Sequence, residues 1–490
     1  MTVLILEEHS SVLPEWWRRR LRARTLIYLD AHLDLQYVSP KRLLDLEQCT
    51  TAEAVKRLEK PHHLVPDRNF SYSLEDFLYP AHRLGLIERL IWVTPPHVKT
   101  GYSRAILDRL QQMDGVLMDD LASFRTASEG WIEGRLLGLA ITICNYRQLE
   151  SMGLPADSLI DIDTDYFVTV PGDEAWVNPR DVFEVLDRLP LKPELITVSR
   201  SVSSGFMPLR YRFFADYLAA LWENRHQDAA HFEQVFRLER QLRGGDVPAA
   251  LTGCKRELDR HPRCAATHYL LSLGEQDPEQ AAEHQRQAEE SCSGYRPDVL
   301  RSACEIPNRQ LPVGPSTMLA LEKQLTETRD NPEKLALAQV ALGLIYCAGG
   351  QVARACALYQ QGAQHFQHHP ELALEIGKRL LGSDRADMFL TAALLDDKTR
   401  AAAHVFLAHS HARRGSLLHA VEHLETAHQM TPAWPQVLSM LAELHQKLGN
   451  EQRAQALQTQ YRHQQRQTEL LAQRLAPEGR APVGQNEALH

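Results

Sequence analysis

Cysteine is scarce in this chain and is nowhere arranged as a structural framework. Only 8 cysteines occur among 490 residues, and no two of them form a CxxC pair. Small secreted domains depend on dense disulfides, so this class of protein is excluded. We expect free thiols in a reducing compartment, and therefore a cytoplasmic protein.

Long apolar runs and an excess of positive charge are missing as well. No segment approaches the ~20 apolar residues that a membrane span requires. The first residues, MTVLILEEHSS, lack the basic region of a signal peptide. The formal net charge is −9, which argues against a surface that binds nucleic acid. We expect neither a membrane nor a nucleic acid as a partner.

The residues that are present divide the chain into two halves of different character. Its length predicts two or three domains, and its 44% hydrophobic and 24% charged residues are typical of soluble globular domains. Up to about residue 225, aliphatic runs alternate with amphipathic stretches. This alternation predicts an α/β domain over residues 1–225, with a mostly parallel sheet and helices on both faces. The expected strands are residues 3–6, 25–29, 90–94, 159–162 and 195–198.

The second half, residues 226–470, shows only helical periodicity and an internal repeat. A set of apolar and small residues recurs with a spacing of 34, the period of tetratricopeptide (TPR) repeats. We therefore expect an all-α array of TPR-like helix pairs, with a generic helical bundle as the alternative, and a disordered tail over residues 471–490. The recurring residues are Leu407, Ala408, His411 and Ala420, followed by Leu441, Ala442, His445 and Ala454.

Acids and histidines gather at the ends of three of the predicted strands. The run from Asp30 to Asp34 has the pattern D-x-H-x-D, with His32 at its centre, and would present all three side chains on one side if the strand continued. Asp161, Asp163 and Asp165 alternate in the same way. Ligands bind outside the carboxyl ends of parallel strands, so a site is expected there.

A divalent metal is the simplest explanation for this concentration of acids. Carboxylates a few Å apart raise one another's pKa and destabilise the fold unless a cation neutralises them. His9, directly after the first predicted strand, adds an imidazole at a third strand end. We predict the metal ligands His9, Asp30, His32, Asp34, Asp161 and Asp163.

These three segments resemble the metal motifs of the arginase and deacetylase superfamily. Arginases bind two manganese ions with a histidine at a strand end, an Asp-Ala-His-x-Asp run and an Asp-x-Asp run, and this chain has LDAHLD and IDID in the same order. More narrowly, EEHSSVLPEWW, YLDAHLDL, DIDTDYF and TVSRSVSSGFMP resemble the arginase-like family that includes peptide arginases. The resemblance covers about residues 1–222. It implies conversion of arginine residues in a peptide to ornithine, with release of urea.

The chain also departs from arginases in ways that affect the substrate site. Leu6-Glu7-Glu8 replaces a Gly-Gly-Asp, and serines follow Arg200 where arginases carry a late glutamate that holds the guanidinium. Another acid must take that role, and the candidates are Glu8, Asp165 and Asp76. Ser199 and Arg200, after the last strand, are predicted to contact the substrate.

The expected mechanism uses two Mn²⁺ ions that lower the pKa of a shared water, which attacks the guanidinium carbon. We predict Asp34, Asp165 and His82 as catalytic residues. His82 is chosen over His62 and His63 as the donor of a proton to the leaving amine. The repeats would bind the peptide substrate or a protein partner. The alternatives are a TPR scaffold with a degenerate metal domain and a metal-dependent deacetylase.

Overall fold

The structure is a computed structural model that describes residues 2–61, 70–96, 107–108, 110–169, 173–296, 301, 315–365 and 369–475. Its first part is built on an eight-stranded sheet with the order β1-β10-β9-β2-β5-β8-β7-β6. The first six of these strands are parallel, and β7 and β6 continue the sheet antiparallel. The strands are β1 (Thr2–Leu6), β2 (Arg24–Leu29), β5 (Ile87–Val93), β6 (Arg125–Thr126), β7 (Ile132–Leu136), β8 (Leu139–Cys144), β9 (Leu159–Asp163) and β10 (Leu195–Ser199).

Helices cover both faces of this sheet because its central strands are apolar on both sides. In β2, Leu26 and Tyr28 belong to one buried core, and Ile27 and Leu29 belong to the other. This division follows from the alternation of side chains along a strand. The first core includes α1 (Val12–Arg18), α2 (Pro40–Glu47), α3 (Ala52–Arg57) and α4 (Leu78–Arg83), and the second includes α8 (Pro179–Arg188) and α9 (Phe214–Trp222).

The predicted α/β architecture is confirmed in this part of the chain, and the five predicted strands are all present. The sequence reading missed the hairpin of β7 and β8. Its two turn residues, Leu137 and Gly138, both have positive φ angles, 49° and 86°. A Leu-Gly pair is a weaker turn signal than Asn-Gly, which explains the omission.

After residue 225 the described chain contains helices and no strand, as predicted. Consecutive helices pack against one another, and the recurring residues Leu407 and Leu441 are buried at equivalent places in α20 and α22. The helices are α10 (His226–Arg243), α11 (Val247–Arg260), α12 (Ala265–Gly274), α13 (Pro278–Ser291), α15 (Pro315–Glu327), α16 (Pro332–Ala348), α17 (Val352–Gly362), α18 (Pro370–Arg379), α19 (Ala386–Ala393), α20 (Asp397–Arg413), α21 (Leu417–Met430), α22 (Pro435–Lys447) and α23 (Glu451–Leu475).

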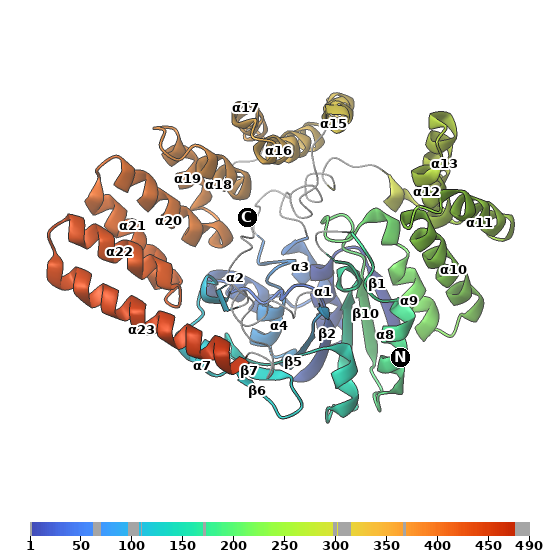
Figure 1. The fold of residues 1–490 in the computed structure, drawn as a ribbon, viewed down its shortest axis with the longest axis horizontal. Coiled ribbons are helices and arrows are strands. Elements are labelled where there is room, and N and C mark those ends of the chain that lie inside the picture. The colour runs from blue at the N-terminus through green and yellow to red at the C-terminus, as the bar shows by residue number, and fades with distance from the viewer. Residues whose placement is uncertain are drawn as a thin grey trace.

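The helical region forms an arc that leaves the α/β part at α10 and returns to it at α23 (Figure 1). At the returning end, α23 contacts β6 and α7 (Met118–Ala122), and the Arg474 side chain donates to the backbone oxygen of Phe124. Leu471 and Leu475 are buried in the core of the α/β part. The ordered helix therefore extends five residues beyond the predicted boundary at 470, and residues 476–490 lie outside the described residues.

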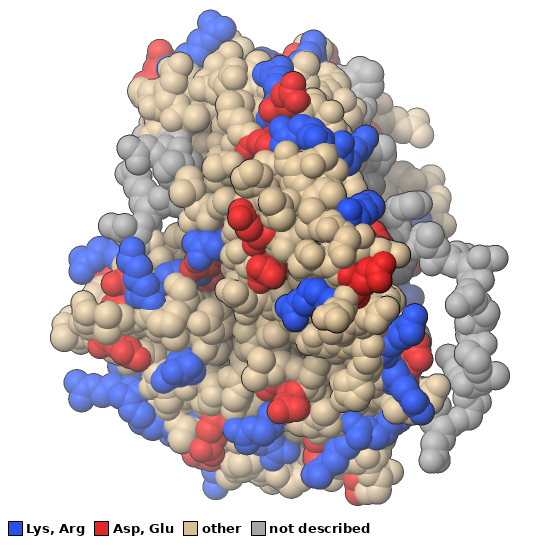
Figure 2. Space-filling view, turned by 90° about the vertical axis from the view of Figure 1, so that its left-hand side faces the viewer, with Lys and Arg blue, Asp and Glu red and all other residues tan. Residues whose placement is uncertain are grey.

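The outer face of the returning arc carries charges of both signs. Figure 2 shows basic and acidic side chains interspersed over this side of the molecule. Among the described residues, no helix has both the length and the apolar character that a membrane crossing requires.

Candidate metal centre

The three acid- and histidine-rich segments meet at one edge of the sheet. The short 3₁₀ helix η1 (His9–Ser11) follows β1, and Asp30 follows β2. Asp161 and Asp163 are among the last three residues of β9. β10 joins β1 to β9, and β9 pairs with β2 in parallel, so the carboxyl ends of these strands are neighbours. This is the edge at which α/β sheets bind their ligands.

The buried imidazole of His9 lies at the centre of the cluster. Its Nδ1 is 3.1 Å from Asp30 Oδ2 and 3.2 Å from Asp34 Oδ2. The same nitrogen is 3.2 Å from Asp163 Oδ2, whereas Nε2 is 2.9 Å from Asp161 Oδ2. Neighbouring ligands of an octahedral cation at ~2.1 Å are about 3 Å apart. The groups around Nδ1 are therefore spaced like ligands of a single ion.

A second group of ligand atoms shares Asp30 with the first. His32 Nδ1 is 2.8 Å from Asp165 Oδ2 and 3.5 Å from Asp30 Oδ1. Ligand atoms of His9, Asp30 and Asp163 lie within 4.8 Å of one another, and so do those of Asp30, His32 and Asp165. Asp30 thus directs Oδ2 toward His9 and Oδ1 toward His32, and it belongs to both groups.

The D-x-H-x-D run reaches this arrangement as a loop and not as an extended strand. β2 ends at Leu29, and the backbone N–H of His32 then donates to Asp30 Oδ1 at 2.6 Å. This turn sends His32 toward Asp165, while Asp34 returns toward His9. The strand alternation considered from the sequence therefore does not place these side chains.

Hydroxyl groups of neighbouring residues donate hydrogen bonds to the carboxylates of the cluster. Tyr28 Oη donates to Asp30 Oδ2 at 2.5 Å and lies 3.0 Å from Asp34 Oδ2. Thr197 Oγ1 donates to Asp161 Oδ1 at 2.5 Å, and Ser201 Oγ donates to Asp163 Oδ2 at 2.6 Å. Such partners orient ligands around a metal.

The carboxylates of the cluster contact histidines, but no lysine or arginine among the described residues offsets their negative charge. In the part of the chain that the structure describes, no lysine or arginine lies within ion-pair distance of Asp30, Asp34, Asp161, Asp163 or Asp165. Burial and the charge of Asp30 raise the pKa of Asp34 to about 7. Burial lowers the pKa of His9, but Asp161 and Asp163 outweigh this effect and raise it well above its ordinary value. A cation bound among these carboxylates would stabilise their charge.

The donor set fits a divalent metal. The groups are carboxylate oxygens and two imidazoles, a mixture that suits Mn²⁺ and leaves Zn²⁺ and Fe²⁺ as alternatives. His32 is the exposed member, because 39% of its side chain is accessible to solvent, and its ring lies 4.8 Å from that of Phe206. Access to the cluster is therefore from the side of His32 and Phe206.

Two of the predicted substrate residues lie beside the cluster. Glu8 is buried, and burial together with the charges of Glu7 and Asp163 raises its pKa well above its ordinary value. Ser199 ends β10 on the same side as Thr197, since the two are separated by one residue. Its buried Oγ has no hydrogen-bond partner among the described residues.

Arg200 and Asp76 are engaged elsewhere. The Arg200 guanidinium donates to Asp216 Oδ1 at 2.7 Å and lines a separate pocket against α11 and α12. Asp76 Oδ2 accepts from Arg42 Nη2 at 2.9 Å, so its charge is already neutralised. We therefore no longer assign Arg200 or Asp76 to the substrate.

The prediction that His82 donates a proton at this centre is wrong on geometric grounds. His82 Nδ1 lies 3.3 Å from the backbone oxygen of Ile87, the first residue of β5. The metal centre lies at the other end of the parallel strands, about 20 Å away at ~3.3 Å per residue. His62 and His63 lie outside the described residues.

Sequence reasoning also missed Tyr28, whose hydroxyl contacts Asp30 and Asp34, and Thr197, whose hydroxyl donates to Asp161. The only available signal was their position, two residues before Asp30 in one strand and two residues before Ser199 in another.

Comparison with models of known protein families and with curated proteins gave no match for this chain.

Proposed function

We propose that this chain is a dinuclear metal-dependent hydrolase that converts arginine residues in a peptide to ornithine and releases urea. The observation that carries the proposal is Asp30, whose two carboxylate oxygens face two different groups of ligand atoms. Two-metal hydrolases hold their ions about 3.5–4 Å apart and use shared carboxylates to do so.

The geometry supports a modified list of ligands. Asp163 and Asp165 belong to the two groups, so we propose them as the Asp-x-Asp pair of the resemblance. Asp161 faces the other ring nitrogen of His9 and orients that imidazole, a role that neighbouring carboxylates commonly have around metals. Two Mn²⁺ ions bound here would supply a water that is nucleophilic at neutral pH.

Glu8 is the best candidate to hold the guanidinium of the substrate. Burial raises the pKa of the Glu8 carboxyl group, and a cation beside the group would favour its ionised form. The arginine side chain supplies such a cation in a planar form that matches a carboxylate. Ser199 Oγ, buried beside the cluster, is available for a further hydrogen bond.

The helical arc supports a peptide rather than a free amino acid as substrate. Its helices α18 and α20 approach the segments next to the metal centre, where Lys60 Nζ lies 3.1 Å from Glu371 and Lys398 Nζ lies 3.2 Å from Glu75. We interpret the helix pairs as TPR-like because residues 34 positions apart, such as Leu407 and Leu441, are buried at equivalent places in their helices. Arrays of this kind bind extended peptides on their concave side.

Metal loading and urea release test the proposal together. The purified chain, loaded with Mn²⁺, is incubated with a peptide that contains one arginine, and urea and the mass of the peptide are measured. We expect about two Mn²⁺ per chain, one urea per arginine and the mass of an ornithine peptide. Asp30→Asn should remove both metal and activity, whereas Asp45→Asn, on the exposed side of α2, should change neither.

The alternatives give different results in the same experiment. Release of acetate from an acetyl-lysine peptide without urea would identify a deacetylase. A folded chain that binds no metal would identify a scaffold protein. Either result would overturn the proposal.

A further inference from the structure

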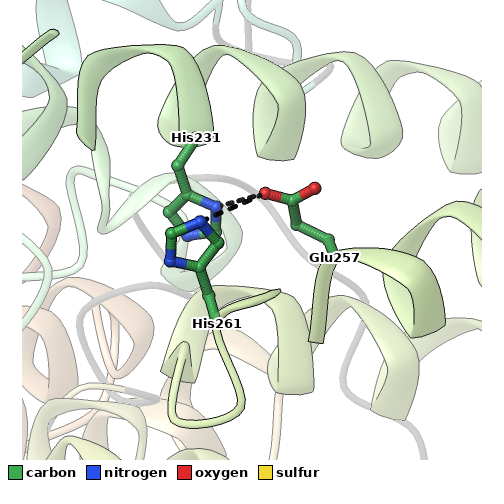
Figure 3. A group of neighbouring side chains, drawn as sticks. All are labelled: His231, Glu257 and His261. Atoms are coloured by element: carbon green, nitrogen blue, oxygen red, sulfur yellow. Dashed lines mark hydrogen bonds and ion pairs between the residues drawn. The ribbon is translucent and has the colours of Figure 1, made fainter. Parts of the chain in front are cut away.

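Outside the metal centre, three side chains form a relay at the junction between the α/β part and the first helix pairs. His231 extends from α10, Glu257 extends from α11, and Cys264 directly precedes α12. His231 Nδ1 lies 2.6 Å from Glu257 Oε1 (Figure 3), and His231 Nε2 lies 3.1 Å from Cys264 Sγ. A nucleophile, a base and an orienting acid are thus aligned at hydrogen-bond distances.

The carboxylate of Glu257 influences which nitrogen of the His231 imidazole carries the proton. A carboxylate only accepts hydrogen bonds, so the 2.6 Å contact favours the tautomer of His231 that carries its proton on Nδ1. Nε2 is then the nitrogen that faces the sulfur, and it is able to take the thiol proton. The ring of His261 packs against that of His231, with centroids 3.9 Å apart and the planes tilted by 30°, and restricts its rotation.

The surroundings favour a thiolate at Cys264. Its sulfur stands at the N-terminal end of the ten-residue helix α12, where the helix dipole stabilises negative charge. Burial raises the pKa of Cys264, but the hydrogen bond and charge of His231 outweigh burial and leave the pKa below its ordinary value. The geometry of the relay and the charges around Cys264 therefore both favour its thiolate form.

Cys264 lines a pocket of about 640 Å³ whose walls are rich in arginine. Arg260 and Arg263 line the pocket from the same segment as Cys264, and Arg200 and Arg212 line it from the α/β part. Arg200, Arg212 and Arg260 each have an acid within ion-pair distance, whereas Arg263 has none among the described residues. The pocket therefore favours an anionic molecule.

We propose that Cys264, His231 and Glu257 form a second reactive site, in which the Cys264 thiolate attacks an electrophilic carbon of an anionic acyl donor. The sulfur lone pair forms an S–C bond, and the bond from the acyl carbon to its leaving group breaks with both electrons on the leaving group. His231 passes the thiol proton to that group, so the products are a thioester on Cys264 and the protonated leaving group. Hydrolysis by one water molecule returns the thiol and a free acid.

Two alkylating reagents of equal size and different charge test the site in the full-length chain. Iodoacetate and iodoacetamide are allowed to react with the reduced protein at pH 7, and the rate at each cysteine is measured by mass spectrometry. Cys292 is the internal control, because it lines the same pocket but has no imidazole contact among the described residues. We expect Cys264 to react at least tenfold faster than Cys292. We also expect iodoacetate to be favoured over iodoacetamide relative to a free cysteine peptide.

Variants separate the components of the relay. His231→Gln should slow the reaction of Cys264 tenfold or more and leave the rate at Cys292 unchanged. Arg263→Gln should reduce the preference for iodoacetate without changing the rate with iodoacetamide. An activated ester that carries a carboxylate should leave an acyl group on Cys264, and the uncharged ester should do so more slowly.

Two results would overturn this assignment. One is a Cys264 that reacts no faster than Cys292 in the unmodified protein, a comparison that requires no variant to fold. The other is a zinc ion that co-purifies at one per chain and protects Cys264, since ligand atoms of His231, Glu257 and His261 lie within 4.8 Å of one another. Urea release from arginine peptides is independent of both results.

Discussion

The phenol of Tyr28 donates a 2.5 Å hydrogen bond to Oδ2 of Asp30, the carboxylate that lies between the two groups of metal-binding side chains. Tyr28 is the last residue but one of β2, and Asp30 directly follows the end of that strand. Burial and the charges of Asp30 and Asp34 raise the pKa of Tyr28 well above its ordinary value. Tyr28 therefore remains a donor throughout the physiological pH range.

Tyr28→Phe should weaken metal binding without unfolding the protein. The change removes one hydrogen bond to a charged group, worth about 1.5–3 kcal/mol. Loss of such an orienting partner typically lowers metal affinity about 10–100-fold. Calorimetric titration with Mn²⁺ measures the effect, and Tyr146→Phe, whose hydroxyl contacts Arg147 at a distance from the cluster, is the matched control. Equal affinity in the two variants would show that Tyr28 does not position Asp30.

Glu8→Gln should separate substrate binding from metal binding. Glutamine has the size of glutamate but cannot ionise, so the attraction for a guanidinium is lost while the metal ligands stay intact. We expect the normal metal content, and a decrease in kcat/KM for an arginine peptide of at least 100-fold, about 2.7 kcal/mol. Exposed Glu53→Gln is the control. Loss of metal from Glu8→Gln would instead make Glu8 part of the metal centre.

The strand ends and their chemistry could be predicted from the sequence because both depend on local order. β2 is apolar from Leu26 to Leu29 and Asp30 follows it directly, whereas β9 begins with Leu159 and Ile160 and carries Asp161 and Asp163 at its end. Placing these ends together required only the rule that parallel strands end at a common edge. The prediction of converging ligands followed from these two facts.

The roles of individual acids could not be predicted in the same way. Asp161, Asp163 and Asp165 have equal spacing in the sequence, but β9 ends at Asp163 and a 3₁₀ turn carries Asp165 toward His32. Asp161 instead meets the other nitrogen of His9. The choice depends on where the strand stops, which sequence patterns locate only to within a few residues.

Asp76 illustrates a second limit of sequence reasoning. It is a candidate for the guanidinium because it is an acid in the right domain, but its partner is Arg42, which is 34 residues earlier and also buried. A buried ion pair between distant positions leaves no periodic signal in the sequence. Only the fold shows that this acid is already neutralised.

Asp76→Asn should therefore reduce stability and leave metal binding unchanged. Removal of one partner leaves the charge of Arg42 buried without full compensation, which costs about 3–5 kcal/mol. We expect a lower thermal unfolding midpoint with about the normal Mn²⁺ content per chain. Asp45→Asn, on the exposed side of the same helix as Arg42, controls for the loss of a carboxylate. Lost metal in a variant of normal stability would return Asp76 to the site.

The helix pair α20–α21 should make the repeat region sensitive to acid. His404 Nδ1 lies 2.9 Å from His423 Nδ1, and His411 stacks on His423 with ring centroids 5.4 Å apart. Burial, together with the charges of His423 and Arg400, lowers the pKa of His404 from 6.5 to about 4. Between pH 4 and pH 6.5, His404 therefore binds a proton in the unfolded chain but not in the folded chain.

The stability that this difference supplies is complete above pH 6.5 and is lost as the pH falls toward 4. His404→Gln removes the titrating group, so the variant should be more stable relative to the unmodified chain at pH 5 than at pH 7.5. Thermal unfolding midpoints of both proteins across this range measure the effect. His409→Gln, on the exposed side of α20, is the control and should keep the original pH profile. A constant difference between His404→Gln and the unmodified chain at all pH values would show that His404 titrates normally, because only a group with a shifted pKa links folding to proton uptake in this window.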